Sequence, residues 1–273
     1  MSSTSTTLGL IAGSKALPLV LAGEARRKGR RVVAVAFEGE TDPALAEQVD
    51  EVIWLRVGQL SKLIQAFVSR GITECVMLGQ IAPKNLFDLR PDLRAMALLL
   101  RLKEKNAHSI FGAIAGELEK DGVRLIEPLE WLAPWMPGAG YCAGPALTPA
   151  QQEVVAFGYR LAREIARLEI GQCVVVKDGT TLAVEGFEGT DACLERGGRL
   201  AGNAGGAVAV KTAKSGHDLR FDIPCIGPRT LQTCADNGIA VLAVEAGKTL
   251  LLDRPELETL ARDRRVSVVT VSD

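Results

Sequence analysis

Short apolar runs alternate with amphipathic segments through the first half of the chain, and this alternation restricts the fold more than any other feature. The run LGLIAG ends at Gly13, and a later run, ECVMLG, ends at Gly79. Strands that alternate with helices are typical of β-α-β units with a parallel sheet. We therefore predict a Rossmann-like parallel-sheet domain over residues 1–133. The predicted strands cover 8–13, 31–37, 52–55 and 74–79, and the predicted helices cover 17–27, 60–69, 94–105 and 109–121.

A stretch rich in proline and glycine separates the two halves of the chain. It covers residues 131–149, and its composition disfavours both helices and central strands. We predict a linker over residues 134–149. With 273 residues the chain is longer than one hydrophobic core usually requires, so we expect a second domain over residues 150–273.

The second domain combines one long helical pattern with several strand patterns. A helix is predicted over 151–168, with Thr148 as its cap. Asp178 and Gly179 separate two valine-rich or alternating runs, which predicts a hairpin turn. Further strands are predicted over 206–213, 238–246 and 248–254. The predicted class is α/β, with a Rossmann-like N-terminal domain and a C-terminal catalytic domain of mixed α/β structure.

Composition excludes several classes of function. The net charge of −1 and an aromatic content of 4% argue against nucleic-acid binding. Six cysteines without a CxxC pair are typical of reduced, buried thiols rather than a disulfide framework or a zinc site. The first residues lack the pattern of a signal peptide, and no apolar run is long enough to span a bilayer. We expect a cytoplasmic protein that is soluble or peripheral to a membrane.

The C-terminal domain carries carboxylates and lysines where many hydrolases carry histidines. The chain has two histidines, which argues against a histidine-ligated zinc site and against a serine–histidine hydrolase. Mg²⁺ prefers oxygen ligands, and lysine offers a compact positive charge to phosphate oxygens. The pattern therefore favours metal-assisted chemistry on a phosphate ester. The residues concerned are Glu185, Glu188, Asp191, Asp222, Glu245, Lys177, Lys211, Lys214 and Arg220.

Three of these acids, Glu188, Asp191 and Asp222, are the candidates for metal ligands and for catalysis. Glu188 and Asp191 are expected on the turn after a strand that ends near Glu185, where carboxylates can converge on one ion. A solvated acidic loop is the alternative. Asp222 lies between two apolar residues, and an acid buried there must be paired, protonated or metal-bound. A structural salt bridge is the alternative for Asp222.

Two glycine turns are candidates for binding a nucleotide. Gly13 and Ser14 follow the first predicted strand, and Gly79 and Gln80 follow the fourth. Backbone amides at such turns can bind phosphate or approach a nucleotide closely. The dinucleotide fingerprint GxGxxG is incomplete, so an ordinary tight turn is the alternative.

Three lysines of the second half are candidates for binding phosphate oxygens. They are Lys177, Lys211 and Lys214. Exposed lysines that only keep a surface soluble are the alternative.

Taken together, these segments resemble the LpxI family, the UDP-2,3-diacylglucosamine pyrophosphatases of lipid A biosynthesis. The resemblance covers nearly the whole chain. It is densest in RLEIGQCVVVKDGTTLAVEGFEGTDACLERGG, RFDIPCIGPRTLQTC and VLAVEAGKTLLLDR, with LGLIAG, ALP and LGQIAPKNLF in the first half. The chain departs from the family at Lys15, where glycine is usual. It also departs at Asn106-Ala107-His108, where many members have Gly-Asp-Asp.

The resemblance implies an activity and a set of partners. UDP-2,3-diacylglucosamine would be hydrolysed to 2,3-diacylglucosamine 1-phosphate (lipid X) and UMP with a divalent metal, Mg²⁺ or alternatively Mn²⁺. It also implies two domains with the substrate between them and a homodimer. The family's essential acid in the FD-P-IG motif matches Asp222, and the EGTD motif matches Glu188, Gly189, Thr190 and Asp191. We expect peripheral association with the cytoplasmic face of the inner membrane, and no nucleic-acid partner.

The leading hypothesis is attack by water on a phosphorus atom of the UDP-lipid, assisted by a metal that Asp222 holds with Glu188 or Asp191. Two other classes remain open. A nicotinamide-dependent oxidoreductase is one, and Glu38, after the second predicted strand, supports it. A non-catalytic regulator that binds a nucleotide or a lipid is the other.

Overall fold

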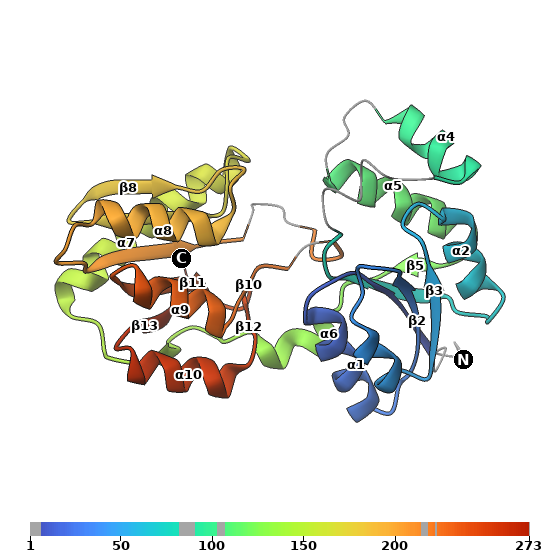
Figure 1. Ribbon diagram of the computed structural model, residues 1–273, viewed down its shortest axis with the longest axis horizontal. Coiled ribbons are helices and arrows are strands. Elements are labelled where there is room, and N and C mark those ends of the chain that lie inside the picture. Colours follow the sequence, from blue (N-terminus) through green and yellow to red (C-terminus); the bar gives the residue numbers. More distant parts are fainter. Residues whose placement is uncertain (1–6, 82–90, 103–106, 214–217, 222, 273) are drawn as a thin grey trace. The chain divides into compact units, whose positions relative to one another are not determined.

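The computed structural model describes residues 7–81, 91–102, 107–213, 218–221 and 223–272. The chain divides into two compact units (Figure 1). The first consists of Met1–Leu132 with Asp218–Asp222, and the second consists of Ala133–His217 with Ile223–Asp273. A short piece from the C-terminal half thus belongs to the first unit, which the sequence patterns do not predict.

A five-stranded sheet in the order β3-β2-β1-β4-β5 forms the centre of the first unit. All pairs of neighbouring strands in it are parallel, which confirms the Rossmann-like prediction. The side chains of Leu8 and Leu10 are fully buried, and β2 is buried from Val32 to Phe37, as expected for strands covered on both faces. The strands are β1 (Thr7–Ala12), β2 (Arg31–Phe37), β3 (Glu51–Leu55), β4 (Glu74–Leu78) and β5 (Arg124–Leu125).

The four helices predicted for the first unit are present close to their predicted positions, whereas the short helices at 43–47 and 129–132 were not predicted. On α2, Leu63 and Phe67 are one turn apart, so both reach the buried core of the sheet. Pro18 lies in the first turn of α1, where a missing amide hydrogen costs nothing. The helices are α1 (Leu17–Arg27), α2 (Leu60–Val68), α4 (Leu93–Arg101), α5 (Ala107–Lys120) and α6 (Leu129–Leu132), with a 3₁₀ helix, η1 (Pro43–Glu47).

A six-stranded sheet in the order β6-β13-β11-β9-β7-β8 forms the centre of the second unit. Strands β9, β11 and β13 are parallel to one another, whereas β6, β7 and β8 add antiparallel pairs. The mixed α/β prediction is confirmed. The strands are β6 (Cys142–Ala143), β7 (Cys173–Lys177), β8 (Thr180–Val184), β9 (Ala207–Lys211), β11 (Ile239–Glu245) and β13 (Ser267–Val271), with a separate parallel pair, β10 (Cys225–Ile226) and β12 (Leu250–Leu251).

Helices cover both faces of this sheet. On β7, Val174 and Val176 pack with α7 on one face, whereas Cys173 and Val175 belong to the core under the other helices. This division follows the two-residue period of a strand. Thr148 caps the start of α7, as the sequence predicts, and Gln151 completes a capping box with it. The helices are α7 (Pro149–Arg167), α8 (Thr190–Leu200), α9 (Pro228–Asp236) and α10 (Arg254–Asp263).

The helix α8 is the main element that the sequence analysis missed. It places Asp191 in the first turn of a helix, not on a turn of the chain. Glycines inside a helix are unfavourable, and Gly197 and Gly198 make the helical pattern of this segment hard to recognise in the sequence. Here they allow close packing, because a Cβ added at Gly197 would lie 2.5 Å from the Cβ of Val175. Gly189, with φ of 86°, precedes the helix in a conformation that favours glycine.

The segment 134–149, expected as a linker, lies in the second unit. It contains β6, which pairs with β13 through Ala143 and Val268. A short 3₁₀ helix, η2 (Ala133–Trp135), overlaps the start of this segment. In the described part of the chain, no helix combines the length and the apolar character required to cross a membrane.

Candidate functional site

Polar side chains gather at one edge of the C-terminal sheet. Strand pairing places Cys173, at the start of β7, beside Lys211, at the end of β9. The amide of Glu185 donates to the carbonyl of Cys173 at 2.8 Å, so the residue that follows β8 lies at the same edge of the sheet. We call Glu185, Thr190, Lys211 and Glu245 the polar edge. Three of its members carry a formal charge, although the side chains of Glu185, Lys211 and Glu245 are all buried.

A chain of hydrogen bonds connects three members of the polar edge. The Lys211 ammonium donates to Thr190 Oγ1 at 2.7 Å, and that hydroxyl donates to Glu185 Oε1 at 2.8 Å. The other carboxylate oxygen of Glu185 accepts from the amide of Gln172 at 3.2 Å. Lys211 is only 8% exposed. A buried ammonium needs such acceptors, so Thr190 and Glu185 hold Lys211 in one place.

Glu245, at the end of β11, is the second buried carboxylate of this edge. It accepts from the amide of Ala213 at 3.0 Å and from the ammonium of Lys248 at 2.6 Å. The first bond fixes the chain just after β9, next to Lys211. Glu185 and Glu245 belong to the predicted group of carboxylates, but no role in the site was predicted for either of them. An acid at the end of an apolar strand was the available signal.

The two acids predicted as metal ligands are each paired with an arginine. Glu188 accepts from the Arg196 guanidinium and from the amide of Gly186 at 3.0 Å. Its own backbone amide, followed by Arg196, holds the pKa of Glu188 below its usual value. Asp191 Oδ2 lies 3.5 Å from the guanidinium of Arg229. These two carboxylates therefore face separate cations.

Lys177 lies at the other end of β7 from Cys173, so it does not share an edge with Lys211. Its ammonium donates to the carbonyl of Ala201 at 2.8 Å, where α8 ends. Asp222 and Lys214 lie outside the described residues.

The two glycine turns of the first unit lie together at the carboxyl ends of β1 and β4. The amide of Gly13 donates to Leu78, and the amides of Ser14 and Gln80 donate to each other's carbonyls at 2.8 and 3.2 Å. A Cβ at Gly13 or at Gly79 would lie within 3.0 Å of the facing backbone. Each turn lies at the end of a strand, as predicted, but the amides of Gly13, Ser14 and Gln80 already have acceptors.

An open pocket of about 750 Å³ lies beside the first of these turns. Lys15, Thr41 and Trp54 are among its lining residues. Lys15 has φ of 75°, a strained conformation for a residue with a side chain, and within the described residues its ammonium has no hydrogen-bond or ion-pair partner. The Trp54 side chain is 39% exposed. The pocket therefore offers an aromatic ring and an available cation.

The described residues do not by themselves fit a divalent cation. In the ranges that the structure describes, no three histidine, cysteine, aspartate or glutamate side chains come together as a metal site. The arginines that pair with Glu188 and Asp191 give the physical reason, because each carboxylate already has a counter-charge.

Family models match both halves of the chain. Residues 7–135 match the LpxI N-terminal domain, and residues 138–269 match the LpxI C-terminal domain. A curated relative is the UDP-2,3-diacylglucosamine pyrophosphatase LpxI of Caulobacter vibrioides, which is 30% identical over 273 residues. That match covers 97% of this chain and 97% of the relative.

Solved structures give weaker likenesses. The N5-carboxyaminoimidazole ribonucleotide synthetase from Thermotoga maritima has a TM-score of 0.25 and 14% identity, and the match covers 62% of this chain and 38% of that chain. A synthetase of the same name in complex with ADP gives 0.28 and 17%, with 68% and 40% covered. This chain thus spans about two fifths of those structures, and TM-scores this low carry no argument about function.

Proposed function

Because the chain belongs to the LpxI family, we propose that it hydrolyses the pyrophosphate of UDP-2,3-diacylglucosamine in lipid A biosynthesis. Water adds to one phosphorus atom, and the bond from that atom to the bridging oxygen breaks. The products are UMP and 2,3-diacylglucosamine 1-phosphate (lipid X). The observation that carries this proposal is the Caulobacter vibrioides relative, because its name states the substrate and its match covers 97% of both chains.

The polar edge supports the proposal with a fixed positive charge. Lys211 is buried, and because water screens its charge less, its attraction to a phosphate oxygen exceeds that of a surface lysine. We assign to Lys211 the neutralisation of charge on the cleaved diphosphate. Thr190 positions its ammonium, and Glu185 holds the Thr190 hydroxyl. Lys177 is a weaker candidate, because its ammonium already donates to the end of α8.

Asp222 remains the proposed centre of the chemistry, and the resemblance of its motif to the family supports this role. A divalent metal, Mg²⁺ or Mn²⁺, would polarise a phosphoryl oxygen when bound. Asp222 is its proposed first ligand, with Glu188 and Asp191 as further candidates once they leave their arginines. The roles proposed for Lys211 and Thr190 do not depend on the metal. Lys214 is proposed to assist Lys211.

The pocket beside Lys15 is the proposed site for the uridine monophosphate portion of the substrate. A pyrimidine ring can stack on the exposed indole of Trp54. The ammonium of Lys15, which has no partner among the described residues, can bind a phosphate oxygen. The turn of Gly13 and Ser14 directly precedes the lining residue Lys15, and it pairs with the turn of Gly79 and Gln80. These four residues are therefore proposed to contact the same portion of the substrate from beside the pocket.

We also propose a homodimer at the cytoplasmic face of the inner membrane, held there peripherally. The chemistry of the substrate supports the membrane association, because a lipid with two acyl chains resides in a bilayer. The resemblance to the family is the basis for the proposed homodimer. No observation favours the oxidoreductase alternative. Glu38, the residue that supported it, lies 3.4 Å from the guanidinium of Arg56 in an ion pair.

The test is incubation of the purified protein with UDP-2,3-diacylglucosamine, followed by mass spectrometry of the products. We expect UMP and the lipid 1-phosphate, loss of both with a chelator, and recovery with Mg²⁺. Water labelled with ¹⁸O identifies the phosphorus atom attacked. Asp222→Ala should abolish turnover, whereas the control Asp236→Ala, at an exposed acid on α9, should retain it. Release of a nucleoside diphosphate, or no product at all, would contradict the proposal.

A further inference from the structure

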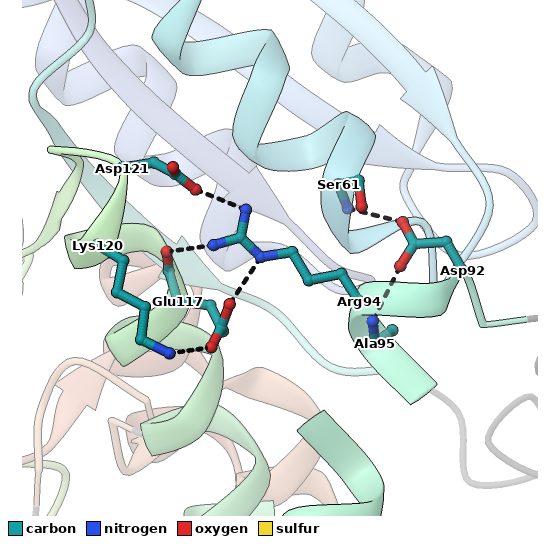
Figure 2. Close-up of polar contacts among 7 residues, drawn as sticks. All are labelled: Ser61, Asp92, Arg94, Ala95, Glu117, Lys120 and Asp121. Carbon is teal, nitrogen blue, oxygen red and sulfur yellow. Dashed lines mark hydrogen bonds and ion pairs between the residues drawn. The ribbon is translucent and has the colours of Figure 1, made fainter. Parts of the chain in front are cut away.

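The helix α4 is fixed to the first unit by polar contacts along one side (Figure 2). The carboxylate of Asp92 caps the helix by accepting from Ala95 at 2.9 Å, and it also accepts from the amide of Ser61 on α2 at 2.7 Å. The Arg94 guanidinium donates to Glu117 at 2.6 Å and also to Asp121. These contacts join α4 to α2 and to α5 and the residue that follows it, so its orientation within this unit is determined.

The opposite side of α4 exposes large apolar side chains. Leu93 is 85% exposed, Leu100 is 78% exposed and Met96 is 45% exposed. At roughly 100° per residue, these three side chains fall within one sector of about 60°. Ala95 and Leu98 point to the core instead. The helix is thus apolar on its inner and its outer face, which is unusual for a helix at a water-exposed surface.

The charge of α4 is entirely positive. Between Leu93 and Arg101 it contains two arginines and no acid. Arg94 is neutralised by Glu117 and Asp121. Arg101 is exposed and, among the described residues, has no acidic partner. An unpaired cation at the end of an exposed apolar face complements a surface that is apolar inside and anionic outside.

We propose that the face of α4 formed by Leu93, Met96 and Leu100 lies in the interface of a bilayer that contains anionic phospholipids, with Arg101 at the headgroups. A single convex helix face suits a bilayer surface, into which such helices sink by roughly 5–10 Å. Part of the argument rests on the proposed function, because a diacylated substrate must be collected from a membrane. The exposed side chains and the charge are independent of it.

The test is sedimentation of the full-length protein with vesicles of phosphatidylethanolamine and phosphatidylglycerol. The double variant Leu93→Gln/Leu100→Gln should bind the vesicles at least about tenfold more weakly. The reason is that neither position then gains the free energy of transferring a leucine from water to an apolar phase. The matched control, Leu168→Gln/Leu200→Gln, removes two leucines of the second unit that are 55% and 60% exposed. Its binding should stay within about twofold of the original, because those positions lie outside α4.

Two further measurements separate the outcomes. Arg101→Gln should weaken binding to the anionic vesicles and leave binding to pure phosphatidylcholine vesicles unchanged. Equal binding by the α4 variant and the original chain overturns the proposal. So does a loss of dimer mass in analytical ultracentrifugation with unchanged vesicle binding, which would assign the face to a second copy. Hydrolysis of detergent-dispersed substrate tests the proposed function separately, and the α4 variant should retain it.

Discussion

Replacing Thr190 by valine tests the polar edge most directly. The two side chains have nearly the same shape, so the change removes one hydroxyl and leaves the packing in place. That hydroxyl accepts from Lys211 at 2.7 Å and donates to Glu185 at 2.8 Å. The substitution therefore removes two hydrogen bonds to charged groups at once, and both charged groups are buried.

The size of the effect follows from these two bonds. A hydrogen bond to a charged group contributes about 1.5–3 kcal/mol, so the free energy of unfolding should fall by about 3–6 kcal/mol. A domain of this size loses roughly 3 °C in Tm per kcal/mol, which gives a decrease of about 9–18 °C. Differential scanning calorimetry measures it. The control Thr190→Ser keeps the hydroxyl and should lose about 1 kcal/mol or less.

The same variant tests the role assigned to Lys211. If Thr190 positions the ammonium, Thr190→Val should lower kcat at temperatures where the protein is folded, and Thr190→Ser should restore most of it. A free energy of unfolding within about 1 kcal/mol of the original chain would refute the reasoning, because buried charges would then tolerate the loss of both bonds.

Two more predictions concern the same unit. In Gly171→Ala the new Cβ would lie 2.1 Å from the carbonyl oxygen of Glu185, so we expect a loss of about 3 kcal/mol or more in urea titrations. Gly138→Ala, with nothing within 4 Å, should change stability little, and an equal effect of both would contradict the packing argument. Burial, and then a hydrogen bond to a carboxylate on α10, raise the pKa of Tyr141 to about 12. In a Tyr159→Phe background, tyrosinate absorbance should therefore titrate near pH 12. The contribution of Tyr141 to stability is complete below about pH 10 and is lost as pH rises through 12. A titration midpoint near pH 10 would refute the raised pKa.

The N-terminal fold could be predicted from the sequence because its strands are continuous apolar runs and its helices have regular periods. Each run from LGLIAG to ECVMLG corresponds to a strand of the sheet. The two glycine turns were also predicted, each at the end of its strand. Their closure could not be predicted, because the bridge between Ser14 and Gln80 depends on two segments that are 66 residues apart.

The candidate site was only partly predictable. The acids at the end of β8 and in the loop after it were visible as a group, but the sequence does not record which cation each one meets. Glu188 pairs with Arg196 on α8, and Asp191 pairs with Arg229 on another helix, α9. Lys177 and Lys211 look alike in sequence, yet strand direction sends them to opposite edges. Tertiary pairing decides these roles.

The discontinuous composition of the first unit has a consequence for biosynthesis. The ring of Phe221 lies 6.1 Å from that of Phe111, and it packs on the core formed by β1 to β5. A ribosome releases Phe221 only after most of the C-terminal sheet has been translated. The unit whose synthesis begins first is therefore completed late. A gene fragment that stops at residue 132 encodes a protein in which Phe111 lacks its contact with Phe221.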